Sequence, residues 1–186
     1  MLDNDYVRVS RDKFYGPADA RAQCGHRVIV ATTDIRVDSD KGVKALRRGD
    51  VSVIDENESL VGISESGYFE VVIKRQRPPA GRPKETIPAE KKALRFEGEC
   101  FFVFEERLEP GHTRARHSHS HRVVIQLNRA RLQQWPEGSS EVFVDTVPDK
   151  PLFNPPVIHT VKNVGDVPLR GVIIVIKPDC GQGPLL

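Results

Sequence analysis

Short runs of β-branched and aromatic residues alternate with turn-forming residues along almost the whole chain. The apolar runs lie at residues 26–37, 49–54, 68–74, 100–108, 121–132, 140–147 and 172–177. Glycine, proline, asparagine, aspartate and serine gather in the segments between these runs, as expected between β-strands. Apart from a turn near residues 88–95, helical periodicity is absent. The pattern predicts an all-β protein built as a sandwich or barrel.

The chain also repeats itself. Residues 7–37 can be laid on residues 102–132 at a constant offset of 95 without a gap. The identities include His26 with His121, Arg27 with Arg122, and Arg36 with Arg131. Self-similarity over this length favours two related β modules over a chance likeness of two hairpins.

The repeat sets the expected domain boundaries. Residues 1–76 form the first module, residues 77–93 a proline-rich linker, and residues 94–186 the second module. Each proline in the linker fixes φ and removes a backbone hydrogen-bond donor. Length supports this division, since 186 residues can bury one large or two small cores.

Three histidines stand at every second position in the second module. His117, His119 and His121 would share one face of a strand, and Val123, Ile125 and Leu127 would continue that face inward. Buried imidazoles need polar partners. A metal site, a satisfied polar pocket without metal, and a histidine cluster that chelates only incidentally all fit this pattern.

The repeat separates these histidines into two kinds. His121 matches His26 in the first module, whereas His117 and His119 fall on Ala22 and Cys24. A histidine that both modules share is expected to serve the common scaffold. We therefore predict structural roles for His26 and His121, and ligand roles for His117 and His119.

A third ligand candidate lies downstream. His159 follows His119 by 40 residues, on a segment that could return as a paired strand. Three imidazoles from two strands can hold one cation while leaving positions open for water or substrate, as in catalytic metal sites.

These residues resemble the motifs of the cupin superfamily, which are small jelly-roll barrels of two antiparallel sheets. Gly111, five residues, His117, one residue and His119 match the first cupin motif in type and spacing. His159 and Asn163 match the end of the second motif. The resemblance implies tandem double-stranded β-helix barrels of the RmlC-like type, a bicupin whose first module lacks metal ligands. Asn163 is then expected to cap a turn or to orient His159 from outside the ligand set.

The sequence departs from the cupin pattern at the glutamate ligand. That residue should fall at Val123 or Val124, neither of which can coordinate a metal. His112 and Gln126 are the available substitutes, although alternation places Gln126 on the opposite strand face. Alternation likewise places Arg114 and Arg116 on the exposed face, and no pocket acid is visible that could serve as a general base.

A site of three histidines resembles that of three-histidine cupins, among which are iron thiol dioxygenases and other metal-dependent oxygenases. The resemblance implies one divalent ion (Fe, Mn, Ni or Zn) and a small anionic ligand, with Fe(II)-dependent dioxygenase-like activity as one candidate. Neutral imidazoles leave the charge of the ion uncompensated, which favours anions. The alternative is a non-catalytic bicupin that binds a small polar ligand or serves as a dimerisation module. The sequence does not decide whether the protein is an enzyme.

Charge and composition exclude some partners. The net charge of +2 gives no electrostatic case for nucleic acid or an anionic membrane, and no apolar run reaches the length of a membrane span. Residues 1–13 contain no stretch like a signal peptide, and three widely spaced cysteines do not form a disulfide framework. We expect reduced thiols, a cytoplasmic location and a homodimer that binds a small molecule.

Overall fold

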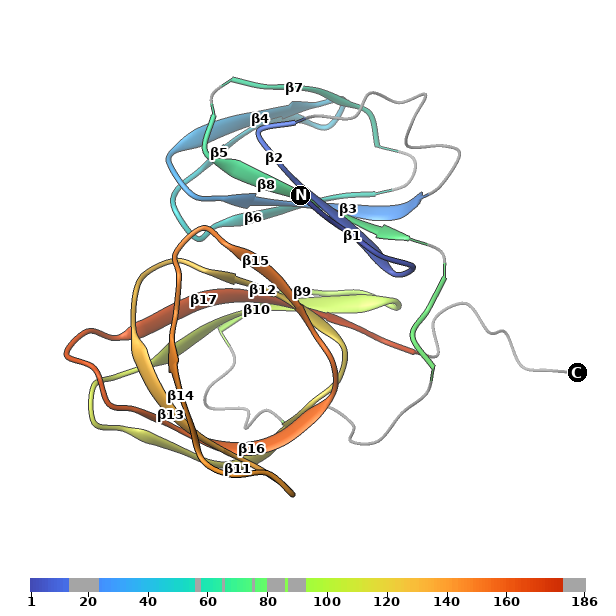
Figure 1. The fold of residues 1–186 in the computed structure, drawn as a ribbon. Helices are drawn as coiled ribbons and strands as arrows, with labels where there is room; N and C mark the ends of the chain where they lie inside the picture. Colours follow the sequence, from blue (N-terminus) through green and yellow to red (C-terminus); the bar gives the residue numbers. More distant parts are fainter. Residues whose placement is uncertain are drawn as a thin grey trace, which may run out of the picture. The chain divides into compact units, whose positions relative to one another are not determined.

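The computed structural model describes residues 1–13, 24–55, 58–64, 66–74, 76–79, 86 and 93–178 (Figure 1). The chain divides into two compact units, Met1–Arg77 and Pro78–Leu186. All regular structure in the described part is β-strand, as the alternating pattern predicted. That part contains no helix long and apolar enough to cross a membrane.

Unit 1 consists of two antiparallel sheets. The five-stranded sheet has the order β1-β2-β8-β3-β6, and the three-stranded sheet has the order β5-β4-β7. The strand bounds are β1 Leu2–Asp3, β2 Val7–Arg11, β3 Cys24–Ala31, β4 Ile35–Ser39, β5 Gly42–Leu46, β6 Val51–Ile54, β7 Leu60–Ile63 and β8 Tyr68–Lys74. Aliphatic side chains from both sheets pack into one core, which includes Ile29, Val37 and Leu60.

Unit 2 is built in the same way. Its five-stranded sheet has the order β15-β12-β17-β10-β9, and its four-stranded sheet has the order β11-β16-β13-β14. The strand bounds are β9 Ala93–Glu97, β10 Phe101–Leu108, β11 Thr113–His119, β12 Arg122–Gln126, β13 Arg131–Pro136, β14 Val142–Asp145, β15 Pro151–Asn154, β16 Val157–Asn163 and β17 Leu169–Ile176.

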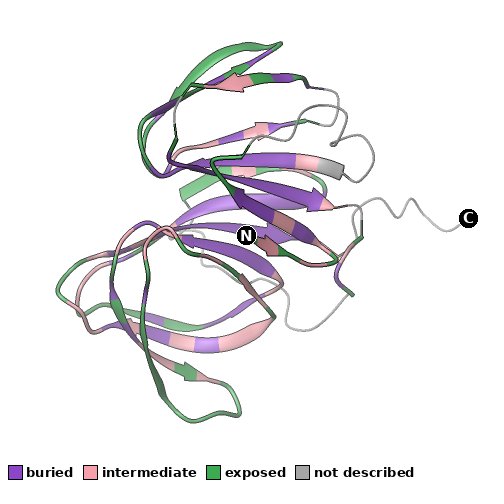
Figure 2. Ribbon diagram, turned by 45° about the horizontal axis from the view of Figure 1, so that its top comes forward, coloured by how far each residue is buried: buried purple, intermediate pink, exposed green. Residues whose placement is uncertain are grey.

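The larger sheets of the two units have corresponding strand orders. Read from the other edge, the sheet of unit 2 runs β9-β10-β17-β12-β15, which repeats β1-β2-β8-β3-β6 strand for strand. The central strands β8 and β17 are buried over nearly their whole length (Figure 2). The repeat in the sequence thus corresponds to a repeat in topology.

The constant offset of 95 does not hold throughout this repeat. Across the larger sheet of unit 1, Ile29 and Ser10 both pair with Glu70, and across that of unit 2, Val124 and Phe104 both pair with Ile173. Ile29 therefore corresponds to Val124 at an offset of 95, whereas Ser10 corresponds to Phe104 at an offset of 94. The prediction of a gapless alignment is wrong for β2, which is shifted by one residue.

The linker expected at residues 77–93 lies largely outside the described residues. One described residue of this segment, Thr86, pairs with β11. Its backbone N–H donates to the carbonyl oxygen of Ser118 at 3.0 Å, and its hydroxyl oxygen accepts from the Ser118 N–H at 2.9 Å. Thr86 therefore belongs to unit 2, at the edge of the strand that carries His117 and His119.

Cys100 takes part in a disulfide bond, so the expectation of reduced thiols is wrong for this residue. Disulfide bonds persist mainly in oxidising compartments. The cytoplasmic location accordingly stays a prediction.

Candidate metal centre

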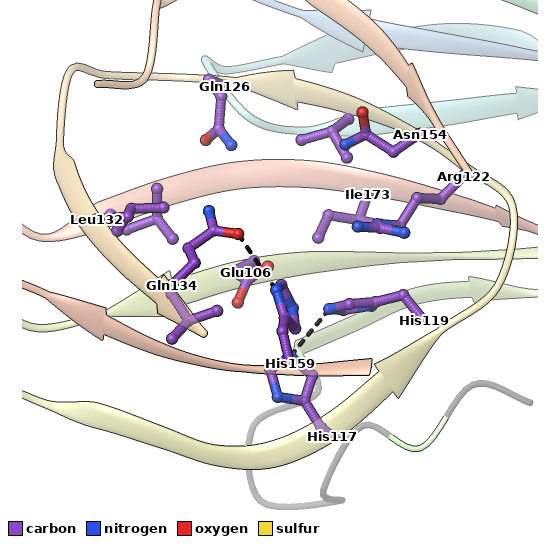
Figure 3. Close-up of a pocket in the computed structure, with 13 residues that line it drawn as sticks. Glu106, His117, His119, Arg122, Gln126, Leu132, Gln134, Asn154, His159 and Ile173 are labelled. Atoms are coloured by element: carbon purple, nitrogen blue, oxygen red, sulfur yellow. Dashed lines mark hydrogen bonds between the residues drawn. The ribbon is translucent and has the colours of Figure 1, made fainter. Parts of the chain in front are cut away.

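Three buried histidines come together inside unit 2. His117 and His119 lie on β11, and His159 lies directly across from His117 on the neighbouring strand β16. The exposed fractions of the three residues are 4%, 3% and 7%. One ring nitrogen from each lies within 4.8 Å of the others, and the side chains point toward one another (Figure 3). Two paired strands thus produce the convergence that sequence spacing suggested.

Hydrogen bonds fix the orientation of two of the rings. The Nδ1–H of His117 donates to the carbonyl oxygen of Ala115 at 2.8 Å, and the Nδ1–H of His159 donates to Oε1 of Gln134 at 3.2 Å. In both rings the Nε2 lone pair is then directed at the centre of the cluster. Such outer hydrogen bonds are the usual way in which a protein fixes the tautomer of a metal-binding histidine.

The spacing of the Nε2 atoms fits a shared cation. Nε2 of His117 lies 2.9 Å from Nε2 of His119. Two nitrogens that bind one ion at about 2.0–2.1 Å stand roughly 2.9–3.4 Å apart. Nε2 of His159 is buried without a hydrogen-bond partner among the described residues. A divalent ion would satisfy this atom, and it would take the place of the proton that His119 Nε2 donates to His117 Nε2.

Burial favours the neutral form of His117 and of His159. Desolvation lowers the pKa of His117 below its usual value, and the nearby His119 and Arg114 lower it further, against the opposing effects of the Ala115 hydrogen bond and Glu106. Desolvation, followed by the repulsion of His117 and His119, lowers the pKa of His159 to about 3. Neutral imidazole is the form that binds metals.

The histidines line a cavity of about 110 Å³ between the two sheets of unit 2. A cavity of about 150 Å³ accommodates benzene, so this one suits a ligand of roughly six non-hydrogen atoms or fewer. Its lining residues are Glu106, His117, His119, Arg122, Val124, Gln126, Leu132, Gln134, Asn154, His159, Val161, Leu169 and Ile173.

The wall formed by β12 differs from the prediction. Arg122, Val124 and Gln126 line the cavity, whereas Val123 and Ile125 are buried on the opposite strand face. The chain leaves the smaller sheet after His119 and enters the larger sheet at Arg122, so the alternation of β11 does not continue into β12. The expected apolar floor of Val123, Ile125 and Leu127 is therefore wrong, as is the expected position of Gln126 on the strand face away from the histidines. Of the two positions for the cupin glutamate, Val124 is the one that faces the cavity.

A carboxylate is nevertheless present in the wall. Glu106, on β10, lines the cavity and forms an ion pair with Arg114. Arg114 is 1% exposed, so its expected place on the outer face is wrong, whereas Arg116 is exposed and pairs with Glu137. The pairing of β11 with β16 shifts register between Arg114 and His117. Because of this irregularity, the side chain of Arg114 points to the same face of the strand as that of His117, although simple alternation would place them on opposite faces.

The other predicted residues lie away from the cavity. His121 is half-buried, with its ring stacked on Phe153 at 5.9 Å between centroids, and His26 lies 3.7 Å from Asp55 in unit 1. His112 is exposed at the turn before β11. Their roles stay predictions.

Asn163 is fully buried at the end of β16. Its amide donates to the carbonyl oxygens of Leu108 and Val167, and its Oδ1 accepts from the N–H of Gly165. These contacts fit the turn-capping alternative. Gln134, which sequence reasoning missed, is the residue that holds His159.

Comparison with known proteins rests on structure alone. The sequence matches no established family model and no curated protein. The structure is similar to a cupin 2 conserved barrel domain protein from Leptotrichia buccalis, with a TM-score of 0.58 at 13% identity, covering 95% of this chain and 86% of that one. It is also similar to Bacillus subtilis oxalate decarboxylase, a protein with Mn(II) centres, with a TM-score of 0.51 at 12% identity. That match covers 83% of this chain and 64% of the decarboxylase.

These likenesses concern the fold, and they agree with the strand order and with the motifs around Gly111, His117 and His119. The three-histidine cluster adds a site that suits a divalent metal. This chain has the fold of the cupin barrels.

Proposed function

We propose that unit 2 binds one divalent ion (Fe, Mn, Ni or Zn) on His117, His119 and His159, and binds a small anionic molecule beside it. The observation that carries this proposal is the convergence of three buried ring nitrogens, with Nε2 of His159 lacking any partner in the described structure. Each unsatisfied buried nitrogen would cost about 1–3 kcal/mol. A bound cation removes that cost.

A divalent ion held there would supply Lewis acidity and open coordination positions. The chain itself supplies orientation and charge. Ala115 and Gln134 hold the rings of His117 and His159, and Arg122 adds a positive charge to the cavity wall. The Nη1 group of Arg122 donates to the carbonyl oxygens of Ser120 and Pro155, which fixes its guanidinium. Neutral imidazoles together with this arginine favour a small anion, and Fe(II)-dependent dioxygenase-like activity is one chemistry that suits such a site.

The tandem arrangement belongs to the same proposal. We interpret residues 1–76 as a cupin-like module without metal ligands, residues 77–93 as the linker, and residues 94–186 as the metal module of a bicupin. The corresponding strand orders support this interpretation. A homodimer is the proposed assembly.

One observation favours the non-catalytic alternative. The cavity wall carries the amides of Gln126, Gln134 and Asn154, which suit a small polar ligand held by hydrogen bonds. A binding module of this kind would not need a metal.

Metal analysis separates the two functions. The full chain is purified without a histidine tag, and its metal content is measured before and after reconstitution with Fe, Mn, Ni and Zn. We expect about one ion per chain, and thermal stabilisation by small carboxylates that depends on the metal. Absence of bound metal after every reconstitution would contradict the proposal. Equal stabilisation of metal-free and metal-loaded protein by neutral sugars would favour the binding module.

A further inference from the structure

The cavity wall contains an ion pair that the three-histidine site does not use. Glu106 lines the cavity from β10, and its Oε1 accepts from Nη1 of Arg114. Arg114 also donates from Nη2 to the carbonyl oxygen of Arg107 at 3.1 Å. The arginine is almost completely buried, whereas the Glu106 side chain keeps 14% of its surface exposed. The arginine thus holds the carboxylate from behind while the carboxylate faces the cavity.

Stability does not explain this arrangement. Removing two charges from water costs several kcal/mol per ion, and hydrophobic residues of similar volume often replace such pairs without loss. The surrounding interior is aliphatic, with Leu108, Leu132 and Val161 packed together. A carboxylate fixed in the wall of a small cavity is therefore better explained by what the cavity binds.

A second acceptor stands beside Glu106. Glu106 and Gln126 are both cross-strand partners of Gly171, so the three residues form one row across the sheet. A Cβ atom at Gly171 would lie only 2.9 Å from Oε1 of Gln126. The glycine thus leaves room for the Gln126 amide over β17. Oε1 of Gln126 is buried and has no hydrogen-bond partner among the described residues.

The positive charge lies elsewhere on the wall. Arg122 is on the same strand as Gln126 and four residues before it, which separates their backbones by about 13 Å. Figure 3 shows Arg122 above His119, with Gln126 toward the opposite end of the view. The wall therefore offers a cation at one end and hydrogen-bond acceptors at the other.

We propose that Glu106 and Gln126 form a subsite for a hydrogen-bond donor, so that the ligand is a small carboxylate bearing a hydroxyl or ammonium group. The inference rests on the proposed function, because it adds a second recognition element to the anion site. The cavity volume limits such a molecule to roughly six non-hydrogen atoms. Glu106 is the specificity-determining residue, with Arg114 as the residue that positions it.

Three probes that share a three-carbon carboxylate test the subsite. Binding of propionate, 3-hydroxypropionate and β-alanine to the full chain is measured by calorimetry, with the protein metal-free and metal-loaded. The last two carry their donor at the end away from the carboxylate, and a hydrogen bond to a charged group makes them bind about tenfold or more tighter than propionate. We expect this preference in both forms of the protein. No preference, or no binding of any probe, would overturn the proposal.

Variants assign the preference to Glu106. In Glu106→Gln the advantage of β-alanine disappears, because a neutral amide offers no charge to the ammonium group, while the bond from Arg114 can still form. Glu105→Gln is the matched control, since Glu105 is the adjacent residue and pairs with Arg95 and Arg170 instead of lining the cavity. If Glu106→Gln does not fold, Gln126→Leu is used in its place, and it should weaken the binding of 3-hydroxypropionate relative to propionate. A preference that appears only with metal and survives Glu106→Gln would be chelation, and the subsite would be rejected.

Metal content, measured on the same samples, keeps the two proposals separate. One ion per chain without donor preference would leave the metal site standing and remove the subsite. Donor preference in a protein that never binds metal would support the subsite and reject the metal site.

Discussion

The two units share a strand order, yet the buried polar side chains in their interiors have different partners. In unit 2, Gln134 on β13 pairs with Val161, and His159 lies two residues before that partner. In unit 1, Ser39 on β4 pairs with Leu60, and Glu58 lies two residues before it. Glu58 therefore stands where unit 2 has His159. Its Oε1 accepts from the Ser39 hydroxyl at 2.8 Å, just as Gln134 contacts His159.

The charge at these equivalent positions differs, because Glu58 is negative and His159 is neutral. Glu58 is buried, and its Oε2 accepts from Nζ of Lys41 at 2.9 Å. Burial raises the pKa of Glu58, but the hydrogen bonds from Lys41 and Ser39 outweigh it and lower the pKa below its usual value. Unit 1 thus supplies its own cation through a side chain. Unit 2 has the neutral imidazole of His159 at the same place, where we propose that a bound metal ion supplies the positive charge.

One arginine is common to both interiors. Arg27 and Arg122 occupy the same position of the repeat, and each is 6% exposed. Arg27 donates to the backbone oxygen of Glu58 and lies 3.8 Å from Glu70, an ion pair inside unit 1. Arg122 instead donates to backbone carbonyls and lines the cavity. The comparison shows that one framework can hold either a closed ion-pair network or an open site.

Removing a histidine ligand should have the largest effect. His117→Ala should lower metal affinity by more than about 100-fold, because even the loss of a residue that only supports a ligand costs 10–100-fold. Isothermal calorimetry with Mn or Zn measures this. Glu58→Gln in unit 1 and His112→Ala at the exposed turn are controls that should keep one ion per chain. Metal retained by His117→Ala would contradict the assigned ligand set.

Gln134 and Ser39 occupy equivalent positions, but we expect Gln134 to support metal binding and Ser39 to support the stability of unit 1. Gln134→Leu frees the His159 ring and should weaken metal binding about 10–100-fold. Ser39→Ala removes a buried hydrogen bond to a carboxylate and should lower the free energy of unfolding by about 1.5–3 kcal/mol without changing metal affinity. Denaturant titration and metal calorimetry on both variants check the contrast. An effect of Ser39→Ala on metal binding would show that the units are not independent in this respect.

Acid should destabilise the metal-free unit 2 before unit 1. The folded-state pKa of His159, about 3, lies below its ordinary value, so the unfolded chain binds the proton first as the pH falls through 6.5. The stability is present above pH 6.5 and declines toward pH 3, with about 2 kcal/mol lost by pH 5. Glu58 also has a lowered pKa, but its stabilisation is lost only as the pH falls below the ordinary glutamate value of 4.5.

The single tryptophan allows the acid sensitivity of unit 2 to be followed by itself. Trp135 lies on β13 of unit 2, so its fluorescence during urea unfolding at pH 7 and pH 5 reports on that unit. His159→Gln should flatten the pH dependence. Equal stability of the metal-free wild type at both pH values would contradict the buried neutral imidazole.

The smallest effect is expected for the shared scaffold histidine. His121→Ala loses the stacking contact with Phe153 and should cost about 1 kcal/mol while one ion remains bound. Thermal unfolding and metal analysis test this together. Loss of metal with an unchanged melting temperature would make His121 a ligand.

The fold and the three convergent histidines could be predicted from the sequence because they depend on local signals. Alternating apolar residues between turn formers gave the strands, and Gly111 with the spaced histidines gave the resemblance to cupins. His117 and His119 needed only the period of one strand. His159 needed only one strand pairing, which the motif supplied.

The rest of the site depends on how strands pair and on which sheet each strand joins. The local pattern of apolar and polar residues does not give this information. Arg114 was placed outside because alternation ignores the irregularity between Arg114 and His117. Glu106 reaches the cavity from β10, and no spacing in the sequence relates it to the histidines. The face of β12 was inverted because the chain changes sheets between His119 and Arg122. Each error therefore concerns either the register of two paired strands or the packing of one sheet on the other.

The corner between β11 and β12 has a consequence for engineering. Because the strands on either side of it belong to different sheets, the three histidines and the opposite cavity wall are specified by separate sets of positions. Libraries at Val124 and Gln126 can therefore reshape the space for a ligand while the histidine positions stay constant. Val124 is also where a designer would introduce a glutamate to change the charge of the ligand set from zero to minus one. The same barrel then becomes a scaffold in which the ligand set and the ligand-binding wall are tuned one at a time.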